Sequence, residues 1–122
     1  MSDCNVCLYI GDYEHPSFFH KKLVKARKSH ECFECREQIR LGQNYWKIIG
    51  KWDGKFDQFR ICTLCEEIAI ELACNGGRMY GCLWEDLQEQ VFPEMTFSCI
   101  QKLKTTETKV FLQKHWNKWK NK

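Results

Sequence analysis

The sequence predicts an α+β fold in which an antiparallel β-hairpin is packed by two to four helices from the C-terminal half of the chain. Two Cys-x-x-Cys pairs, Cys32/Cys35 and Cys62/Cys65, flank residues 36–61, whose pattern indicates a single hairpin. After the second pair, apolar residues recur at every fourth position, which indicates helix. The 122 residues suit one compact domain, and 43% hydrophobic residues would fill a modest core.

The four cysteines of these pairs are candidate metal ligands. A Cys-x-x-Cys turn, or knuckle, directs both sulfurs toward one point about 2.3 Å away, and two knuckles complete a tetrahedral shell for Zn²⁺. We therefore expect a zinc ribbon with Cys32, Cys35, Cys62 and Cys65 as ligands. Four sulfurs leave no position for water or substrate, so this zinc is expected to stabilise the fold rather than to catalyse a reaction.

The hairpin is predicted from strand alternation and from its turn. Residues 45–52 form the first strand, with successive side chains on opposite faces. Asp53-Gly54 suits a type I′ turn, which needs positive φ angles, and residues 56–61 form the returning strand. This pairing would bring the two knuckles together.

Two helices are expected after the hairpin. The first begins near Thr63, directs one apolar face at the ribbon, and ends at residues 75–77, Asn-Gly-Gly. The second spans about residues 79–92 and stops at Pro93.

A last helix is expected near the C-terminus. Thr105 or Thr106 would cap it, after a short amphipathic piece that contains residues 97–103. Its basic, Trp-containing end at residues 114–120 is expected to dock on the domain, and a membrane surface or a partner groove is the alternative.

We expect a single domain over residues 1–122 with three parts. These are an irregular N-terminal segment with a Cys-x-x-Cys pair and a basic arm (1–31), the zinc ribbon (32–65) and the helical part (66–122). The arm, residues 21–31, is either a short strand or an exposed segment.

The cysteines also indicate the compartment. Their number, nine, is odd, and they cluster in Cys-x-x-Cys pairs, which favours metal binding in a reducing compartment over disulfides. The first residues lack the features of a secretion signal, and no run approaches the roughly 18 apolar residues of a membrane span. We expect a cytoplasmic protein.

A second zinc site is the favoured use of the N-terminal pair, Cys4 and Cys7. These sulfurs need further ligands, and we expect Cys74 and Cys82 to supply them across the loop between the first two helices. The other candidates are His15, His20 and His30. The alternative is that Cys74 and Cys82 are buried thiols, as Cys99 is expected to be.

Part of the sequence resembles a group of small zinc-ribbon-like proteins encoded by bacteriophages and prophages. The resemblance lies in Lys25-Ala-Arg-Lys-x-His30-x-Cys32-x-x-Cys35, in Gly50-Lys-Trp-Asp-Gly-Lys-Phe56, in Cys62-x-x-Cys65 and in residues 80–87, and it covers about residues 4–92. It implies zinc and a phage origin, hence the cytoplasm of a bacterial host, but no particular function. Arg36 departs from the pattern, because such knuckles usually carry Gly after the second Cys.

Charge is unevenly distributed along the chain. Residues 21–60 contain eleven Lys or Arg and five Asp or Glu, whereas residues 61–100 contain Arg78 alone and seven Asp or Glu. This asymmetry suggests surfaces with different partners, an intramolecular attraction, or ordinary solvated faces.

The first of two binding hypotheses is that the protein binds a host protein or nucleoprotein as an adaptor or inhibitor. The resemblance to phage accessory proteins is its main support, and the acidic surface is expected to include Glu85, Asp86 and Glu89.

The second hypothesis is nucleic-acid binding by the hairpin. Basic residues interleaved with aromatic residues suit single strands, because cations contact phosphates and rings stack on bases. The candidates are Lys47, Lys51, Trp52, Lys55, Phe56 and Arg60. Alternatively, Trp46 and Trp52 pack on the first helix and the lysines are only solvated.

An enzymatic role is not expected. A zinc deaminase needs a His-x-Glu and a Pro-Cys-x-x-Cys motif, and the sequence has neither. A redox role for Cys62 and Cys65 at a helix N-terminus is a third hypothesis, but the matching pair at Cys32 and Cys35 favours metal.

Overall fold

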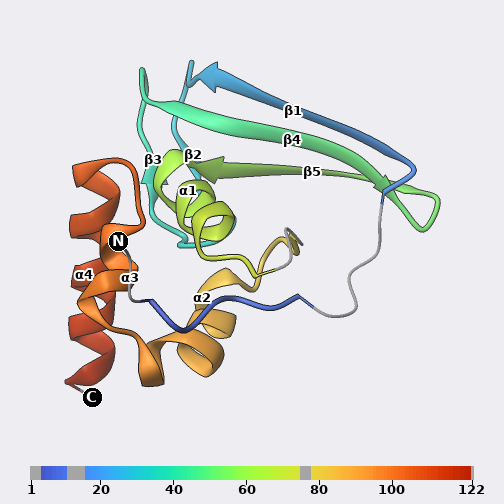
Figure 1. Ribbon diagram of the computed structural model, residues 1–122. Coiled ribbons are helices and arrows are strands. Elements are labelled where there is room, and N and C mark those ends of the chain that lie inside the picture. Colours follow the sequence, from blue (N-terminus) through green and yellow to red (C-terminus); the bar gives the residue numbers. More distant parts are fainter. Residues whose placement is uncertain (1–3, 11–15, 75–77, 122) are drawn as a thin grey trace.

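A computed structural model describes residues 4–10, 16–74 and 78–121. Its largest sheet is antiparallel with the strand order β1-β4-β5, formed by β1 (Phe18–Lys25), β4 (Asn44–Trp52) and β5 (Lys55–Cys62). A second small sheet pairs β2 (His30–Glu31) with β3 (Gln38–Ile39). Figure 1 shows the larger sheet along one side of the molecule, with α1 next to it and the other helices further away.

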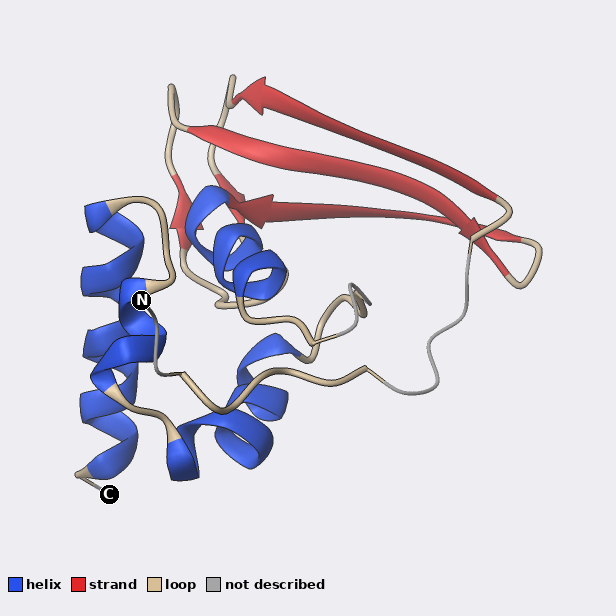
Figure 2. Cartoon of the chain, viewed as in Figure 1, coloured by secondary structure: helices blue, strands red, loops and turns tan. Residues whose placement is uncertain are grey.

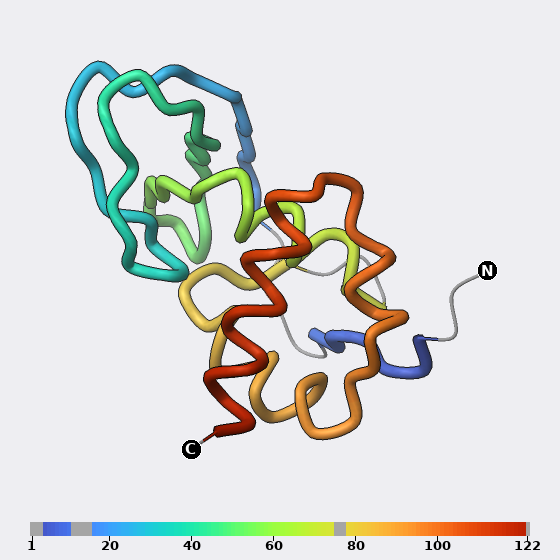
Figure 3. The backbone as a smooth tube through the Cα atoms, turned by 90° about the vertical axis from the view of Figure 1, so that its left-hand side faces the viewer, coloured from blue at the N-terminus to red at the C-terminus, as the bar shows by residue number. Residues whose placement is uncertain are grey.

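The second half of the chain is helical. It consists of α1 (Thr63–Glu71), α2 (Leu83–Asp86) with a following π-helical turn (Leu87–Val91) and 3₁₀ turn (Phe92–Glu94), α3 (Phe97–Gln101) and α4 (Thr106–Lys120). Figures 2 and 3 show these helices gathered at one end of the molecule. The predicted combination of antiparallel strands and C-terminal helices is therefore confirmed. Among the described helices, none has both the length and the apolar character needed to cross a membrane.

The predicted hairpin is confirmed. Pairing between β4 and β5 places Trp52 opposite Lys55, and the φ angles of Asp53 and Gly54 are 50° and 76°. Both turn residues thus have the positive φ that a type I′ turn requires. At the other end of the hairpin, Tyr45 pairs with Cys62, so the strands end beside the second knuckle.

The expectation of an irregular N-terminal segment is wrong for residues 18–20, and of the two alternatives for the basic arm, the strand is confirmed for residues 21–25. Residues 18–25 form β1, which pairs along its whole length with β4, from Phe18 opposite Lys51 to Lys25 opposite Asn44. Both faces of β1 are largely exposed, so its sequence lacks the apolar alternation that identifies a half-buried strand. Its conformation depends on pairing with a distant segment.

The helices differ from expectation at two boundaries. The second helix begins at Leu83 rather than near residue 79, because the φ of 99° at Gly81 lies outside the helical region. A side chain at Gly81 would also be too close to Phe33, since a Cβ there would lie 2.7 Å from its ring. The first helix ends at Glu71, before the predicted stop at residues 75–77, which itself lies outside the described residues. The predicted cap of α4 is confirmed, since the Thr105 side chain accepts a hydrogen bond from Thr108 N.

The helical half packs around α4. Trp116 Nε1 donates a hydrogen bond to Phe92 O at 3.3 Å, and the rings of Phe92 and Trp119 lie 5.7 Å apart, so the predicted docking of the C-terminal helix is confirmed. Glu67 of α1 holds the start of α4, because it accepts hydrogen bonds from the backbone of Lys104 at 2.8 Å and of Thr105 at 3.2 Å.

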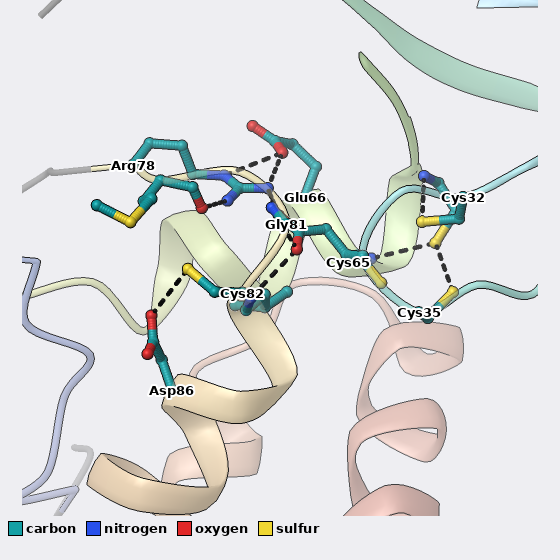
Figure 4. Close-up of polar contacts among 12 residues, drawn as sticks. Cys32, Cys35, Cys65, Glu66, Arg78, Gly81, Cys82 and Asp86 are labelled. Atoms are coloured by element: carbon teal, nitrogen blue, oxygen red, sulfur yellow. Dashed lines mark hydrogen bonds and ion pairs between the residues drawn. The ribbon is translucent and has the colours of Figure 1, made fainter. Parts of the chain in front are cut away.

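A buried ion network joins the first knuckle to α1 and α2 (Figure 4). Arg78 Nη2 lies 2.9 Å from Glu66 Oε1 and 2.8 Å from Glu34 Oε2, the second contact being an ion pair without hydrogen-bond geometry. Lys21 of β1 adds a contact of 2.7 Å to Glu66. Glu34 also accepts hydrogen bonds from Gly81 N and Leu83 N, so one knuckle residue holds the start of α2.

The charges of this network depend on each other. Burial alone would lower the pKa of Arg78, but the Glu66 and Glu34 carboxylates raise it above its usual value. Both carboxylate side chains are almost inaccessible, at 0% for Glu34 and 3% for Glu66. Removing Arg78 would leave buried negative charge with less compensation.

We predict that Arg78→Met lowers the free energy of unfolding by about 3 to 5 kcal/mol, the usual cost of breaking a buried ion pair. The measurement is denaturant unfolding followed by circular dichroism. The control is Glu31→Ala, which removes a pair with Arg36 whose side chains are 62% and 59% exposed. It should cost less than about 1 kcal/mol. Equal effects of the two substitutions would contradict the role of the network.

Candidate metal centre and basic sheet face

Four cysteine sulfurs meet where the sheet, the first knuckle and α1 join. Cys32 and Cys35 follow β2, Cys62 ends β5, and Cys65 lies in the first turn of α1. Their sulfur atoms all lie within 4.8 Å of one another. Cys32, Cys62 and Cys65 are buried and Cys35 is half-buried, so the four predicted ligands do form a cluster that could hold a metal ion.

The first knuckle is a tight turn. Arg36 N donates to Cys32 O at 3.0 Å, and Cys32 N donates to Glu37 O at 2.9 Å. Arg36 has a φ of 65°, a left-handed conformation in which Gly avoids a steric cost that other residues meet. Although Arg36 replaces the Gly usual for such knuckles, the turn still closes, and the guanidinium lies 5.0 Å from the Phe33 ring centroid.

Backbone amides point at the sulfurs. Cys62 N lies 3.3 Å from Cys32 Sγ, and Cys65 N lies 3.4 Å from Cys62 Sγ, which caps the N-terminus of α1. Such amide contacts stabilise thiolates, the form in which cysteine binds metal. The donor set and its surroundings therefore fit a cation.

The cluster favours a bound cation for an electrostatic reason as well. Hydrogen bonds with the Cys32 and Cys35 sulfurs raise the pKa values of Cys62 and Cys65, and burial raises them further. Without a cation, the four groups thus cannot all be thiolates near neutral pH. A divalent ion at the centre would remove this penalty and release the protons.

The predicted second site is not assembled from the four cysteines proposed for it. Cys7 forms a disulfide with Cys74, but Cys4 forms one with Cys99, the residue expected to be a core thiol. Cys82 is bound elsewhere, since its sulfur donates to Asp86 Oδ2 at 3.3 Å. Burial and the Asp86 carboxylate raise the pKa of Cys82 to about 12.

The histidine alternatives do not complete a site either. His15 lies outside the described residues, His20 is exposed on β1, and His30 lies against Tyr45 with ring centroids 5.4 Å apart. Among the described residues, only the cluster of Cys32, Cys35, Cys62 and Cys65 gathers three or more free metal-binding side chains.

The larger sheet has a basic outer face, the face turned away from α1. Strand register aligns Lys22, Lys47 and Arg60 directly across β1, β4 and β5. A second aligned row consists of Phe18, Lys51 and Phe56. The outward positions of the three strands carry no acidic residue.

A groove of about 1050 Å³ continues this face beyond the end of β1. Five cations line it together with His30 and Tyr45: Lys22, Lys25, Arg27, Lys28 and Lys47. Burial and the nearby charges of Arg60, Lys28 and Lys47 lower the pKa of His30, which indicates a positive potential.

Of the six hairpin residues predicted to contact nucleic acid, four lie on the outer face: Lys47, Lys51, Phe56 and Arg60. Trp52 does not lie on the outer face, because strand alternation directs its side chain to the inner face. There its indole covers Gly50 and packs near Phe59 and Tyr80. Lys55 is paired directly with Trp52 and therefore also lies at an inner-face position.

The predicted acidic surface lies on the far side of the domain, on α2 and the π-helical turn. Glu85 and Glu89 are exposed, whereas Asp86 is half-buried and accepts the Cys82 hydrogen bond. Sequence reasoning missed Phe18 and Lys22 as members of the outer face. The basic run at 21–31 signalled Lys22, nothing signalled Phe18, and the register of this segment with β4 could not be obtained from the sequence.

Comparisons of the chain with models of protein families, with curated proteins and with solved structures find no match.

We predict that Cys65→Ser lowers the metal content of the purified protein by one ion per chain and lowers its melting temperature. Loss of one sulfur opens the shell and leaves the other three thiols without a shared cation. Native mass spectrometry measures the metal content, and Cys82→Ser is the control that should retain it. A Cys65→Ser protein with unchanged metal content would contradict the assignment.

Proposed function

We propose that the outer face of the sheet binds single-stranded nucleic acid, and that a structural zinc ion in the four-cysteine cluster holds this sheet on the helical half. The observation that carries the proposal is the row of Lys22, Lys47 and Arg60 across three adjacent strands. A row of cations suits a phosphate backbone.

This row is unfavourable for the isolated sheet. Directly opposite residues have Cβ atoms about 5 Å apart, and like charges at this distance destabilise strand pairing. The described residues provide no ion pair for Lys22, Lys47 or Arg60. Arg60 Nε also has no hydrogen-bond partner among them, although the atom is buried. A bound polyanion would supply the missing negative charge.

Exposed aromatic rings favour a single strand over a duplex. Phe18 and Phe56 are 49% and 64% exposed, their ring centroids lie 6.0 Å apart, and Lys51 Nζ lies 5.4 Å from the Phe56 ring. Bases stack on such rings only when they are unpaired. The aromatic row and the cationic row lie on one face, so bases and phosphates of one strand could contact both.

The groove extends the proposed path. It adds Lys25, Arg27 and Lys28 to the cations at one end of the sheet. Eight residues of β1 span about 26 Å at roughly 3.3 Å per residue, which suits several nucleotides.

Zinc is the proposed metal because four thiolates in a closed tetrahedral arrangement are typical of structural zinc. The backbone amides that point at the sulfurs and the burial of three ligands support this role. The proposed centre is a zinc ribbon whose metal fixes the hairpin end against α1, with no part in a reaction.

The test is fluorescence anisotropy with a labelled single-stranded oligonucleotide. Lys47→Ala should weaken binding about 5- to 10-fold and lower the slope of log K against log salt by about 0.7 to 1, the effect of one lost phosphate contact. Phe56→Ala should weaken binding by at least about 5-fold without changing that slope, because it removes stacking.

Lys118→Ala is the matched control, since Lys118 is an exposed lysine on α4. It should bind as the unmodified protein does. If Lys47→Ala and Lys118→Ala weaken binding equally, or if a duplex of the same length binds as tightly as the single strand, the proposed face is wrong.

A protein partner is the second candidate function, and one observation favours it. An apolar groove of about 520 Å³ lies between α3 and α4, where Phe97 and Val110 are 61% and 63% exposed. Together with exposed Glu85 and Glu89, it offers a surface for a host protein, as expected of a phage accessory protein.

For this candidate, we expect the protein to retain a nuclease-resistant partner from bacterial lysate. Val110→Glu, or the pair Glu85→Lys and Glu89→Lys, should reduce retention at least 10-fold with unchanged metal content. Retention that neither variant alters would contradict a partner site on these surfaces.

A further inference from the structure

The N-terminal Cys-x-x-Cys pair meets two cysteines from the helical half. Cys7 lies beside Cys74, just beyond α1, with a Cα–Cα distance of 5.2 Å, and Cys4 lies beside Cys99 of α3 at 4.7 Å. Figures 1 and 3 show residues 4–10 running beside this part of the molecule.

Backbone hydrogen bonds to the residues after α1 hold the N-terminal Cys-x-x-Cys pair in place. Leu8 N donates to Leu72 O at 2.6 Å and Cys74 N donates to Leu8 O at 2.9 Å, which fixes Cys7 next to Cys74. The Cys4 sulfur lies 3.3 Å from Val6 O, the carbonyl bonded to the nitrogen of Cys7. The chain therefore folds back between the two cysteines, and the Cys4 sulfur lies near the Cys7 backbone.

The oxidation states of the cysteines in this chain must be mutually compatible. The cluster of Cys32, Cys35, Cys62 and Cys65 consists of free thiols, which a metal requires. An environment that keeps these thiols reduced also reduces accessible disulfides, and Cys74 is exposed.

We propose that Cys4, Cys7, Cys74 and Cys99 form a second zinc site with four sulfur ligands in the reduced protein. Two equivalents of a dithiol reduce the two disulfides to four thiols and are themselves oxidised to cyclic disulfides. Binding of one Zn²⁺ then releases four protons. Sulfurs around a tetrahedral zinc lie about 3.8 Å apart. Within each cysteine pair, the Cα–Cα distance of 4.7 or 5.2 Å allows the two side chains to reach this separation.

This ligand set replaces Cys82 with Cys99. Cys82 is excluded because its sulfur donates a hydrogen bond to Asp86, whereas Cys99 is the residue that lies beside Cys4. Cys99 is fully buried among apolar residues of the helical core. The second zinc would connect the N-terminal segment and α3 to the residues just after α1, the helix whose first turn carries Cys65 of the first cluster.

The test maps alkylation of the unmodified protein, purified without added metal. Three samples are denatured and treated with iodoacetamide: one after a chelator, one after a phosphine reductant and one after neither. Zinc-bound cysteines become reactive after metal removal alone, whereas disulfide cysteines require the reductant. The ribbon cysteines are the internal standard for metal binding, and native mass spectrometry run in parallel counts zinc before denaturation.

The expected result is two zinc ions per chain, with Cys4, Cys7, Cys74 and Cys99 alkylated without reductant. Reaction of these four only after reduction, with one zinc per chain, would show two disulfides and overturn the proposal. One zinc per chain with the four cysteines reactive in every sample would overturn it as well.

A pair of variants tests the ligand set. Cys99→Ser should lower the zinc content from two ions to one, and Cys82→Ser should leave two. If Cys82→Ser loses the second zinc instead, the proposed set is wrong. Should Cys99→Ser fail to fold, the alkylation map and the Cys82→Ser zinc count still decide the question without it.

Discussion

Four sulfurs crowded into a buried site are the constraint on which the rest of this fold depends. The first knuckle positions Cys32 and Cys35, the end of β5 positions Cys62, and the first turn of α1 positions Cys65. Sheet, knuckle and helix must therefore keep their relative positions for the cluster to exist. The neighbouring Cys32 and Cys35 sulfurs raise the pKa values of Cys62 and Cys65, so a cation is needed for all four groups to be thiolates. Glu34, inside the first knuckle, extends the same constraint to α2 and Arg78.

Strand alternation divides the sheet into a face for stability and a face available for binding. Ile48 and Ile61 face inward and are fully buried, whereas Lys47 and Arg60, each one residue away, face outward. The inner face packs against α1, and its aromatic residues continue toward Tyr80. Because the buried inner face packs on α1 and stabilises the sheet, the outer face can carry adjacent like charges that would otherwise weaken strand pairing.

Local signals in the sequence were sufficient for the hairpin and the four-cysteine cluster. Cys-x-x-Cys spacing and the Asp53-Gly54 turn act within a few residues, so one chain segment contains all the information. Register and long-range pairing were not available in this way. Pairing of β1 with β4 determines that Lys22 joins the row with Lys47, and the inward turn of Trp52 reflects its contact with Gly50. The sequence predicts a core thiol at Cys99, because nothing near Cys99 in the sequence indicates that Cys4 lies beside it.

The position of the N-terminal segment restricts the order in which the protein can assemble during translation. Leu8 forms a parallel β-bridge with Ala73, and Cys4 contacts Cys99, 95 residues later in the chain. The three-stranded sheet and the four-cysteine cluster are complete in sequence at Cys65, so their residues emerge while the helical half is still being synthesised. Residues 4–10 leave the ribosome before the rest of the described chain but acquire their final contacts among the last. Until then the nascent chain carries Cys4 and Cys7 without their native neighbours and must avoid incorrect pairing with the ribbon cysteines.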